Sequence, residues 1–528
     1  MAKYANLIAA IEAAIKTNGT QAITGQVLQT QLKNMISKLG SAYQFGGLVQ
    51  PTDAFSFDTD AKIAFLACTQ GRYPAFGNFS LRSGEVALFI YEGTWKKEII
   101  SYYANTQIYG IRHFFNNASP DLTRIGDADL HRDLPVQSLM RRCVVDDTGA
   151  VRYYLNADDS TKKEDGTAAN LTGADGQVMV EIPAHYRKAS LNTAGGYMDI
   201  EISLYPFEGA IRVPRYLVSA YEATLDREDN KLASVVNASA KYRGGNNNAD
   251  WDGTYRSLLG LPATNINLTD FRTYGRNRGT GWGCYDYNAH LAIYWLFAIE
   301  YATLNSQKAF NPDLDTAGYH QGGLGPGVTN FSNWDNYNSN NPIIPCGFTN
   351  SLGNKTGVKT FTFTPEQAAA YGSEHSESVP SYRGIENPFG HIWKWTDGFL
   401  GVGTGEYQEI YVCRDASKYA SVVTSDYVHF SIHEATANGY CKAIVASDPN
   451  LQAEIRVFGD IFDRDDSGSD STYFCDYHYH TNSEGVVYGL QVGGSASGGS
   501  VAGLAFFSAN RGPALATTSV GSRLCWSE

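Results

Sequence analysis

Hydrophobic residues at the start of the chain recur every three or four positions, which is the spacing of one face of a helix. Asn18-Gly19 ends the first predicted helix, Thr24 can cap the second, and Gly40 ends it. Short amphipathic helices cannot bury an apolar stripe alone, so we expect residues 1–42 to serve oligomerisation or attachment, with packing on the same chain as the alternative. The two stripes are Leu7, Ile8, Ile11 and Ile15, and then Leu28, Leu32, Met35, Ile36 and Leu39.

From residue 43 to 102 the pattern changes to short runs of β-forming residues. Residues 62–68 form one such run. Residues 85–91 and 94–100 form two more, and the Glu92-Gly93 pair between them predicts a hairpin. We therefore expect a small, mostly β module here.

Residues 103–134 show neither the helical nor the strand period, and we expect them to be a linker. The segment contains His113, Asp127, His131 and Asp133, but their spacing is not that of a metal site. We expect these side chains to lie on a solvated surface.

Beyond residue 135 the pattern is of strands and turns, with one clear exception. Around residues 291–302 the apolar positions form a wide helical face, so this helix should be buried against a sheet. The positions are Leu291, Tyr294, Trp295, Ala298, Ile299 and Ala302.

The charge balance excludes one class of partner. The 528 residues include 41 Lys and Arg against 54 Asp and Glu, a net charge of −13, so the chain has no general attraction for nucleic acid. No secretory signal and no apolar run long enough for a membrane span are visible, so we expect no membrane insertion. Only 18% of residues are charged, while Gly, Tyr and Phe are abundant, which favours turns and aromatic surfaces.

The eight cysteines are scattered, without a Cys-x-x-Cys pair, which excludes a zinc ribbon or a thioredoxin-type site. We expect free thiols in the core. They are Cys68, Cys143, Cys284, Cys346, Cys413, Cys441, Cys475 and Cys525.

Residues 384–398 form the most informative local run, Gly-Ile-Glu-Asn-Pro-Phe-Gly-His-Ile-Trp-Lys-Trp-Thr-Asp-Gly. It resembles the N-x-x-G-N-x-W-E-W signature of the C-type-lectin fold in its formylglycine-generating-enzyme subtype. His391 stands for the usual Asn and Lys394 for the usual Glu. Trp393 and Trp395 alternate along a strand, so we expect both to face one side and fill a core layer as scaffold.

Further passages extend the resemblance. Residues 178–183 (Val-Met-Val-Glu-Ile-Pro) and 219–224 (Ser-Ala-Tyr-Glu-Ala-Thr) look like two strands of that family. A run from Gly493-Gly494-Ser495 closes with Gly521-Ser522-Arg523-Leu524, and this is similar to the G-x-R-L ending of proteins diversified by retroelements. The resemblance implies an α+β chain with a C-type-lectin-like domain over 135–528, variable at about 495–519. The segments before it also look like phage tail proteins.

The composition of residues 495–519 fits that resemblance. Mutation of template adenines turns an Asn codon AAC into codons that never encode Lys, Glu, Gln, Met or Trp. None of these five residue types occurs in the segment, whereas Gln491 precedes it and Trp526 follows it. A loop of small residues would show part of this depletion without any diversification.

The resemblance implies a phage tail fibre or receptor-binding protein whose variable side chains contact the host. Phe506 and Phe507 could be aromatic anchors, with burial in the core as the alternative. The scaffold would comprise Trp393, Trp395, Gly494, Gly503, Gly521 and Arg523. The receptor-binding positions would be Ser495, Ser497, Gly498, Val501, Phe506, Phe507, Ala509, Asn510, Leu515, Thr517 and Thr518.

Neither catalysis nor a metal or other cofactor is expected. The paired reactive cysteines of formylglycine-generating enzymes lie shortly after a Gly-Gly-Ser, but here no Cys follows until Cys525. His478 and His480 would share one face of a strand, and two histidines without a third ligand favour a polar surface pair beside Tyr477 and Tyr479. Residues 463–468 mimic the start of a calcium loop, but Phe474 stands where a bidentate Glu is needed, so at most an incidental ion is expected.

The resemblance also implies partners: a bacterial surface receptor, either protein or glycan, other phage tail proteins, and further copies of the chain in a homotrimer. The location would be the virion. Two alternative functions stay open, a glycan-cleaving tail protein and a structural tail or baseplate connector without a receptor.

Overall fold

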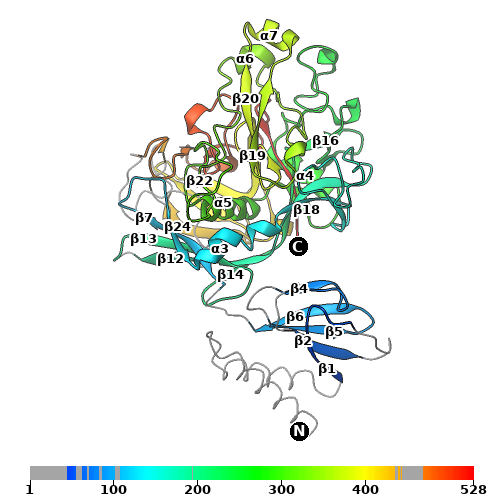
Figure 1. Cartoon of the computed structure of the whole chain (residues 1–528). Helices are drawn as coiled ribbons and strands as arrows, with labels where there is room; N and C mark the ends of the chain where they lie inside the picture. The colour runs from blue at the N-terminus through cyan, green and yellow to red at the C-terminus, as the bar shows by residue number, and fades with distance from the viewer. Residues whose placement is uncertain are drawn as a thin grey trace. The chain divides into compact units, whose positions relative to one another are not determined.

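The computed structural model describes residues 44–54, 62–67, 71–81, 86–101, 107–192, 194–433, 438–440, 442 and 468–528. The chain divides into two compact units, Met1–Gln107 and Ile108–Glu528 (Figure 1). The two helices expected within residues 1–42 lie outside the described residues. Within them, no helix has the length and apolar character that a membrane crossing needs.

The described part of the N-terminal unit is a small β structure, as the sequence of residues 43–102 predicts. Its sheet has the order β1-β2-β5-β6, and β5 and β6 are the two arms of the predicted hairpin, with Gly93 at a φ of 82° in the turn. Its core is aromatic, since Tyr73 and Phe89 pack edge to face at 4.9 Å. The described strands are β1 (Gln44–Val49), β2 (Ile63–Ala67), β3 (Gly71–Tyr73), β4 (Phe79–Leu81), β5 (Val86–Tyr91) and β6 (Trp95–Ser101).

The C-terminal unit is mostly sheet with few helices, a mixed α and β structure. One sheet has six antiparallel strands, and the last one along the chain, β30, lies inside it between β15 and β18. In order across the sheet they are β10 (Val151–Tyr154), β9 (Arg141–Val145), β11 (Gln177–Ile182), β15 (Tyr216–Ser219), β30 (Leu524–Ser527) and β18 (Trp282–Cys284).

A five-stranded sheet corrects the predicted linker. Residues 109–114 and 123–126 are strands in it, and α3 (Ala128–Asp133) follows, so most of residues 103–134 belongs to the C-terminal unit. His113 and His131 are buried rather than solvated. The partner of β7 is β13, more than eighty residues later, which no local pattern reveals. The strands are β14 (Ile211–Val213), β12 (His185–Asn192), β13 (Tyr197–Ser203), β7 (Tyr109–Phe114) and β8 (Thr123–Gly126).

The largest sheet of the described chain has eight strands and carries the Trp-Lys-Trp motif on β22. The short strand β29 (Val520–Gly521) pairs in parallel with the start of β22. The other strands, in order, are β24 (Val428–His433), β23 (Gln408–Val412), β22 (Trp393–Gly403), β27 (Val487–Val492), β28 (Phe507–Arg511), β26 (Tyr477–His480) and β25 (Gly439–Tyr440).

The predicted helix is α5 (Tyr287–Tyr301), and all fifteen of its residues are buried. It begins at Asp286, whose carboxylate accepts the backbone N–H groups of Asn288 and Ala289. It packs on β22 and β7, which belong to two different sheets. Sheet strands thus cover the helix on more than one face, and its polar residues Asn288, His290 and Glu300 are buried with the apolar ones.

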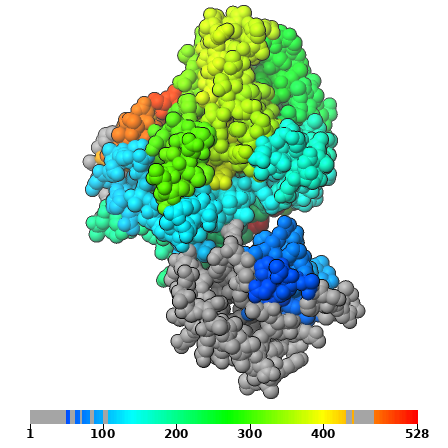
Figure 2. Space-filling view, viewed as in Figure 1, coloured from blue at the N-terminus to red at the C-terminus, as the bar shows by residue number. Residues whose placement is uncertain are grey.

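The remaining elements connect these sheets. In Figure 1, α6, α7, β19 and β20 gather at one end of the C-terminal unit, and Figure 2 shows this end as a projection. The remaining elements of the C-terminal unit are β16 (Thr224–Asp226), β17 (Lys231–Ala233), α4 (Leu268–Arg276), α6 (Trp334–Asn338), β19 (Gly357–Thr362), α7 (Pro365–Tyr371), β20 (Ser376–Tyr382), β21 (Ile385–Glu386), and the 3-10 turns η2 (Gln137–Leu139), η3 (Ala240–Tyr242), η4 (Ala249–Trp251), η5 (Asn350–Leu352), η6 (Ala416–Lys418) and η7 (Gly499–Val501).

The six described cysteines are free and buried, as expected. Cys68 and Cys441 lie outside the described residues. Burial raises the pKa of the Cys143, Cys284 and Cys525 thiols, so these groups stay protonated at neutral pH.

Candidate functional site

Arg523 of the terminal motif joins two of the other resembled passages, residues 219–224 and 384–398. Its side chain is completely buried, and its guanidinium donates to the Ser219 carbonyl (3.1 Å) and to the carbonyls of Glu386 and Asn387. Ser219 opens one passage, while Glu386 and Asn387 belong to the other. The three sequence motifs thus meet at one buried side chain, which is a position for scaffold rather than for contact with a ligand.

The two departures from the resembled motif meet at a single carboxylate. Lys394 Nζ lies 2.9 Å from Glu222 Oε1, and His391 Nδ1 donates to the other oxygen of Glu222. His391 Nε2 accepts the backbone N–H groups of Ile343 and Ile344 at 2.9 and 3.1 Å, so this imidazole is the neutral Nδ1–H tautomer. Sequence analysis missed Glu222 as the partner, although both residues that depart from the motif carry groups that bind a carboxylate.

The protonation of this cluster follows from its burial. Burial raises the pKa of Glu222, but the Lys394 ammonium and the hydrogen bond from His391 outweigh it and lower the value to about 2. Burial lowers the pKa of Lys394 to about 8, against the opposing effect of Glu222. At pH 7 both groups are charged, and they neutralise each other inside the core.

Trp393 and Trp395 differ in exposure but share a core cluster. Trp395 is fully buried, whereas Trp393 is partly exposed and its ring lies 4.5 Å from that of Phe506. The Trp393 backbone N–H donates to the Ser519 carbonyl (3.0 Å). Trp393 therefore contacts both the middle and the end of the segment expected to vary.

The expected scaffold glycines stand where a side chain would collide. Gly494 has a φ of 81°, and an added Cβ would lie 2.8 Å from the Phe506 ring. A Cβ on Gly503 would lie 1.9 Å from Asp476 Oδ1. At Gly521 it would lie 2.6 Å from Ile392 Cδ1. All three positions require glycine for close packing.

The backbone of residues 495–519 is fixed to elements outside the segment. In its first half, Ala496 N–H donates to the His391 carbonyl and Gly499 N–H to the Thr329 carbonyl, both at 2.8 Å. In its second half, the Thr517 carbonyl accepts the Asn265 N–H at 2.9 Å. These backbone bonds do not depend on which side chains the segment carries.

Seven of the expected receptor-binding positions are at least partly exposed on this fixed backbone. The chain around residues 470–505, coloured orange to red-orange, reaches the surface at the left of Figure 2. The positions are Ser497, Gly498, Val501, Asn510, Leu515, Thr517 and Thr518.

Four of the expected positions are buried, which corrects the prediction. Phe506 and Phe507 are 1% and 2% exposed and lie in the main core cluster, together with Ala509. Ser495 is also buried. Phe507 and Ala509 alternate along β28 toward the core, and Phe506 packs under Trp393 and Tyr479. The aromatic anchors are therefore core residues, the alternative that the sequence left open.

The surface beside this segment is aromatic. The Tyr477 ring lies 5.1 Å from that of Tyr440 and 5.0 Å from that of Tyr479, and the Tyr479 ring lies 5.7 Å from that of Phe506. The three tyrosines are partly exposed. We define the candidate face as Tyr440, Tyr477, Tyr479 and Trp393 together with the seven exposed positions. Such rings offer a large apolar contact area, and the tyrosines add a hydroxyl group.

The histidines of β26 correct a second prediction. His478 and His480 do share one face of the strand, with rings 5.8 Å apart, but this face is buried. The pairing of β26 with β28 directs them inward beside Phe507. The sequence prediction placed the two histidines on the surface. In the structure, Tyr477 and Tyr479 at the alternate positions of the strand are the partly exposed residues.

Metal ligands do not gather in the part of the chain that the structure describes, where no group of three His, Cys, Asp or Glu side chains could hold an ion. The calcium-like loop at residues 463–468 lies outside the described residues except for Gly468.

Comparison with known proteins finds only weak structural similarity. No family model matches the sequence, and no curated protein does. Among solved structures, the chain is similar to the Major Tropism Determinant P3c variant with a TM-score of 0.24 and 11% identity, over 90% of this chain and 85% of that one. The U1 variant gives a TM-score of 0.22 with 10% identity over the same shares, and the M1 variant gives 0.18 with 11% identity, over 92% of this chain and 98% of that one. TM-scores this low establish neither a shared fold nor a function.

Proposed function

We propose that this chain is a phage tail receptor-binding protein, an adhesin that contacts the bacterial surface through the candidate face. In this proposal the C-terminal unit has a C-type-lectin-type fold of the formylglycine-generating-enzyme subtype, and residues 495–519 are diversified by a retroelement. The observation that supports this proposal most directly is that the backbone and the side chains of residues 495–519 have different roles. The backbone of this segment is bonded to fixed elements, while seven of its expected positions are at least partly exposed.

That separation is what a variable binding surface needs. A change of side chain at an exposed position such as Ser497 or Thr517 alters the contact surface without removing a core contact. Buried positions such as Ala509 would not tolerate such change. We therefore propose that receptor specificity depends on the exposed positions and on the aromatic rings beside them, as in antibody paratopes.

A single face of this size binds weakly, and several copies on one particle would raise the overall affinity through avidity. We propose a homotrimer, held by the N-terminal segment and joined through it to other tail proteins in the virion. The receptor would be a protein or a glycan of the host surface. The proposal is of binding without bond cleavage and without a cofactor.

Binding of the purified, fluorescently labelled full chain to bacterial cells tests the proposal. Ser497→Arg changes an exposed side chain of the candidate face, and Thr123→Arg is a control at an exposed position of β8 in another sheet. We expect Ser497→Arg to reduce cell binding at least about tenfold, which is 1.4 kcal/mol, while the control leaves it unchanged.

Other results would favour the alternatives. Equal cell binding by both variants and the parent would favour a structural connector. Release of reducing ends from surface polysaccharide would favour a glycan-cleaving protein. Sequencing of the encoding genome tests the diversification: a near-copy of the segment that differs only at adenines, beside a reverse transcriptase gene, is expected, and its absence would leave an undiversified adhesin.

A further inference from the structure

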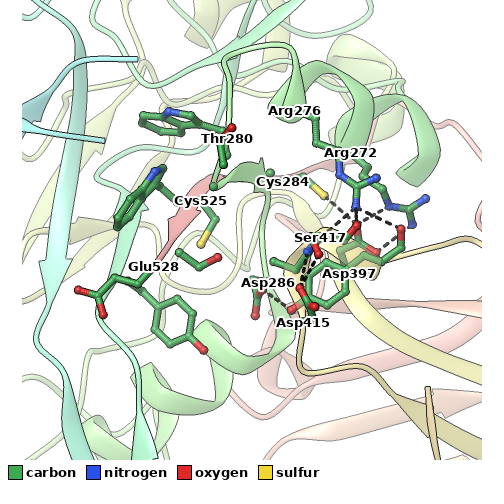
Figure 3. A pocket seen from close by; sticks show the side chains of 18 of the residues that line it. Arg272, Arg276, Thr280, Cys284, Asp286, Asp397, Asp415, Ser417, Cys525 and Glu528 are labelled. Atoms are coloured by element: carbon green, nitrogen blue, oxygen red, sulfur yellow. Dashed lines mark hydrogen bonds and ion pairs between the residues drawn. The ribbon is translucent and has the colours of Figure 1, made fainter. Parts of the chain in front are cut away.

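The C-terminal unit contains a cavity of about 840 Å³ that shares no residue with the candidate face. It lies where β15, β18 and β30 of the six-stranded sheet meet the end of α4 and η6. Figure 3 shows Thr280 and Glu528 on one side, Arg272, Asp397, Asp415 and Ser417 on the other, and Cys284 and Cys525 between them. A cavity of this volume has the size of small-molecule sites.

The floor of the cavity is polar, buried and rigid. Arg272 Nε and Nη2 donate to the two carboxylate oxygens of Asp397 at 2.6 and 2.9 Å, and Nη1 donates to Ser421 Oγ at 3.0 Å. These bonds use three of the five guanidinium N–H groups. Arg272 and Asp397 are 6% and 2% exposed, so the pair is held in the core with N–H groups to spare for a ligand.

A second carboxyl on the floor is also engaged. Asp286 accepts the Tyr419 hydroxyl and two backbone N–H groups at the start of α5. Burial raises its pKa, while the hydrogen bonds from Tyr419 and the backbone oppose the shift. Asp286 therefore presents no unopposed negative charge to the cavity.

Charges on the rim balance as well. Arg276 and Arg414 are exposed there, and so are Asp415 and Glu528. Arg276 Nη2 donates to the carbonyls of Ala416 and Tyr419 at 3.0 and 3.2 Å, which fixes its position over the opening. The lining has three arginines and four carboxyl groups, and Arg212 outside it pairs with Glu528 at 3.0 Å. A charged ligand would need an unopposed opposite charge, which these pairs do not offer.

Aromatic side chains complete the lining: Trp282, Trp526, Tyr216 and Tyr419. The Trp282 indole N–H donates to the Asp147 carbonyl at 2.9 Å, so that ring is held in a fixed orientation. Rings of this kind cover the C–H faces of a pyranose, while hydroxyl groups around the same sugar can accept from guanidinium and donate to carboxylate oxygens.

We propose that this cavity binds a neutral polyhydroxylated ligand, a saccharide unit, through the Arg272–Asp397 pair and the aromatic wall. The site is separate from the candidate face and does not depend on the function proposed for it. Its ligand would be recognised by fixed residues, whereas the candidate face would vary.

A large side chain in place of Gly283 would block the cavity. Gly283 lies on β18 in the lining with an ordinary backbone conformation, and an added Cβ would meet no atom within 4 Å. Gly283→Phe would therefore fill space that a ligand needs, and Gly283→Ala is the matched control. Thr280→Trp at the exposed rim is a second blocking variant, and thermal unfolding shows which variants are folded.

Saturation-transfer NMR on the full chain measures binding of glucose, galactose and N-acetylglucosamine, with glucosamine and glucuronate as charged probes. We expect a signal from at least one neutral sugar, kept in Gly283→Ala and weakened about tenfold or more, 1.4 kcal/mol, in each folded blocking variant. Binding of only the charged probes, no binding of any sugar, or equal binding by the blocked variants would overturn the proposal. Cell binding of Ser497→Arg reports on the candidate face independently.

Discussion

Lys394 Nζ lies 2.9 Å from Glu222 Oε1, and neither side chain is more than 2% exposed. The two residues come from different motif passages, and the lysine occupies a position where the resembled signature has Glu. A carboxylate at 394 would face a second buried carboxylate, so the lysine and Glu222 belong together as a pair. The cluster is completed by His391, which holds the other oxygen of Glu222.

Removing the lysine charge should destabilise the fold. Lys394→Met keeps a long apolar side chain but leaves Glu222 buried without its ion-pair partner, so we expect a loss of about 3–5 kcal/mol in the free energy of unfolding. Urea unfolding of the full chain, followed by far-UV circular dichroism, measures it. The double variant Lys394→Met/Glu222→Gln removes both charges and should recover part of the loss. A single variant as stable as the parent would contradict the pairing.

Acid should destabilise the C-terminal unit through three buried histidines. Burial lowers the pKa of His113 and His185 to about 4 and that of His290 to about 3. Because these folded-state values lie below the unfolded value of about 6.5, their contribution is complete above pH 6.5 and is lost as the pH falls toward 4. At saturation the loss is about 3 kcal/mol for each of His113 and His185 and about 5 kcal/mol for His290, and Glu222 adds a further loss between pH 4.5 and 2.

His113 gives a control for this pH dependence. It is 3% exposed, neither ring nitrogen has a hydrogen-bond partner among the described residues, and its ring lies edge-on to Phe115 and Phe474 at 5.4 and 5.5 Å. We expect His113→Phe to keep the stability at pH 7 and to flatten the decline between pH 6.5 and 4. Unfolding curves at pH 7.0, 5.5 and 4.5 compare the two chains, and an unchanged slope would rule out His113 as a contributor.

Exposed and buried positions of the segment should respond differently to the same change. Ser497→Tyr places a ring in solvent and should alter the free energy of unfolding by less than about 0.5 kcal/mol. Ala509→Tyr forces the same ring into a fully buried site and should cost about 1–3 kcal/mol or more. Differential scanning calorimetry distinguishes them. Similar melting temperatures for both variants would mean that Ala509 can open to solvent.

Gly503 and Asp476 should be energetically coupled. An alanine at 503 would bring its Cβ within 1.9 Å of Asp476 Oδ1, so Gly503→Ala should destabilise the chain. Shortening the neighbour in Gly503→Ala/Asp476→Ala relieves the collision. We expect a coupling energy of about 1–3 kcal/mol from the double-mutant cycle in urea, and additive effects would argue against the contact.

Local patterns predicted the elements whose burial is set by their own sequence. The hairpin of β5 and β6 follows from its β-forming runs and the Gly93 turn, and helix α5 follows from the spacing of its apolar residues, whereas strand β11 was expected from the resemblance of residues 178–183. The period failed for β7 and β8, since β7 lies between β8 and the distant strand β13, and β8 is the outer strand of that sheet in the described chain.

In the candidate site as well, local patterns predicted some features, and tertiary contacts determined the others. The motifs singled out passages that meet in the structure, but they did not indicate that Glu222 would face Lys394 or that Phe506 would lie beneath Trp393 and Tyr479. Alternation along β26 correctly grouped His478 with His480 and Tyr477 with Tyr479. Which of the two faces is buried depends on the pairing of β26 with β28, and this is a tertiary contact.

The position of β30 sets an order of events during synthesis. Leu524–Ser527 lies between β15 and β18, so the six-stranded sheet stays open until these residues have left the ribosome. The segment expected to vary is translated immediately before them. Residues 495–519 must therefore be complete before this sheet can close, and a substitution in them that prevents closure would leave an unfolded chain.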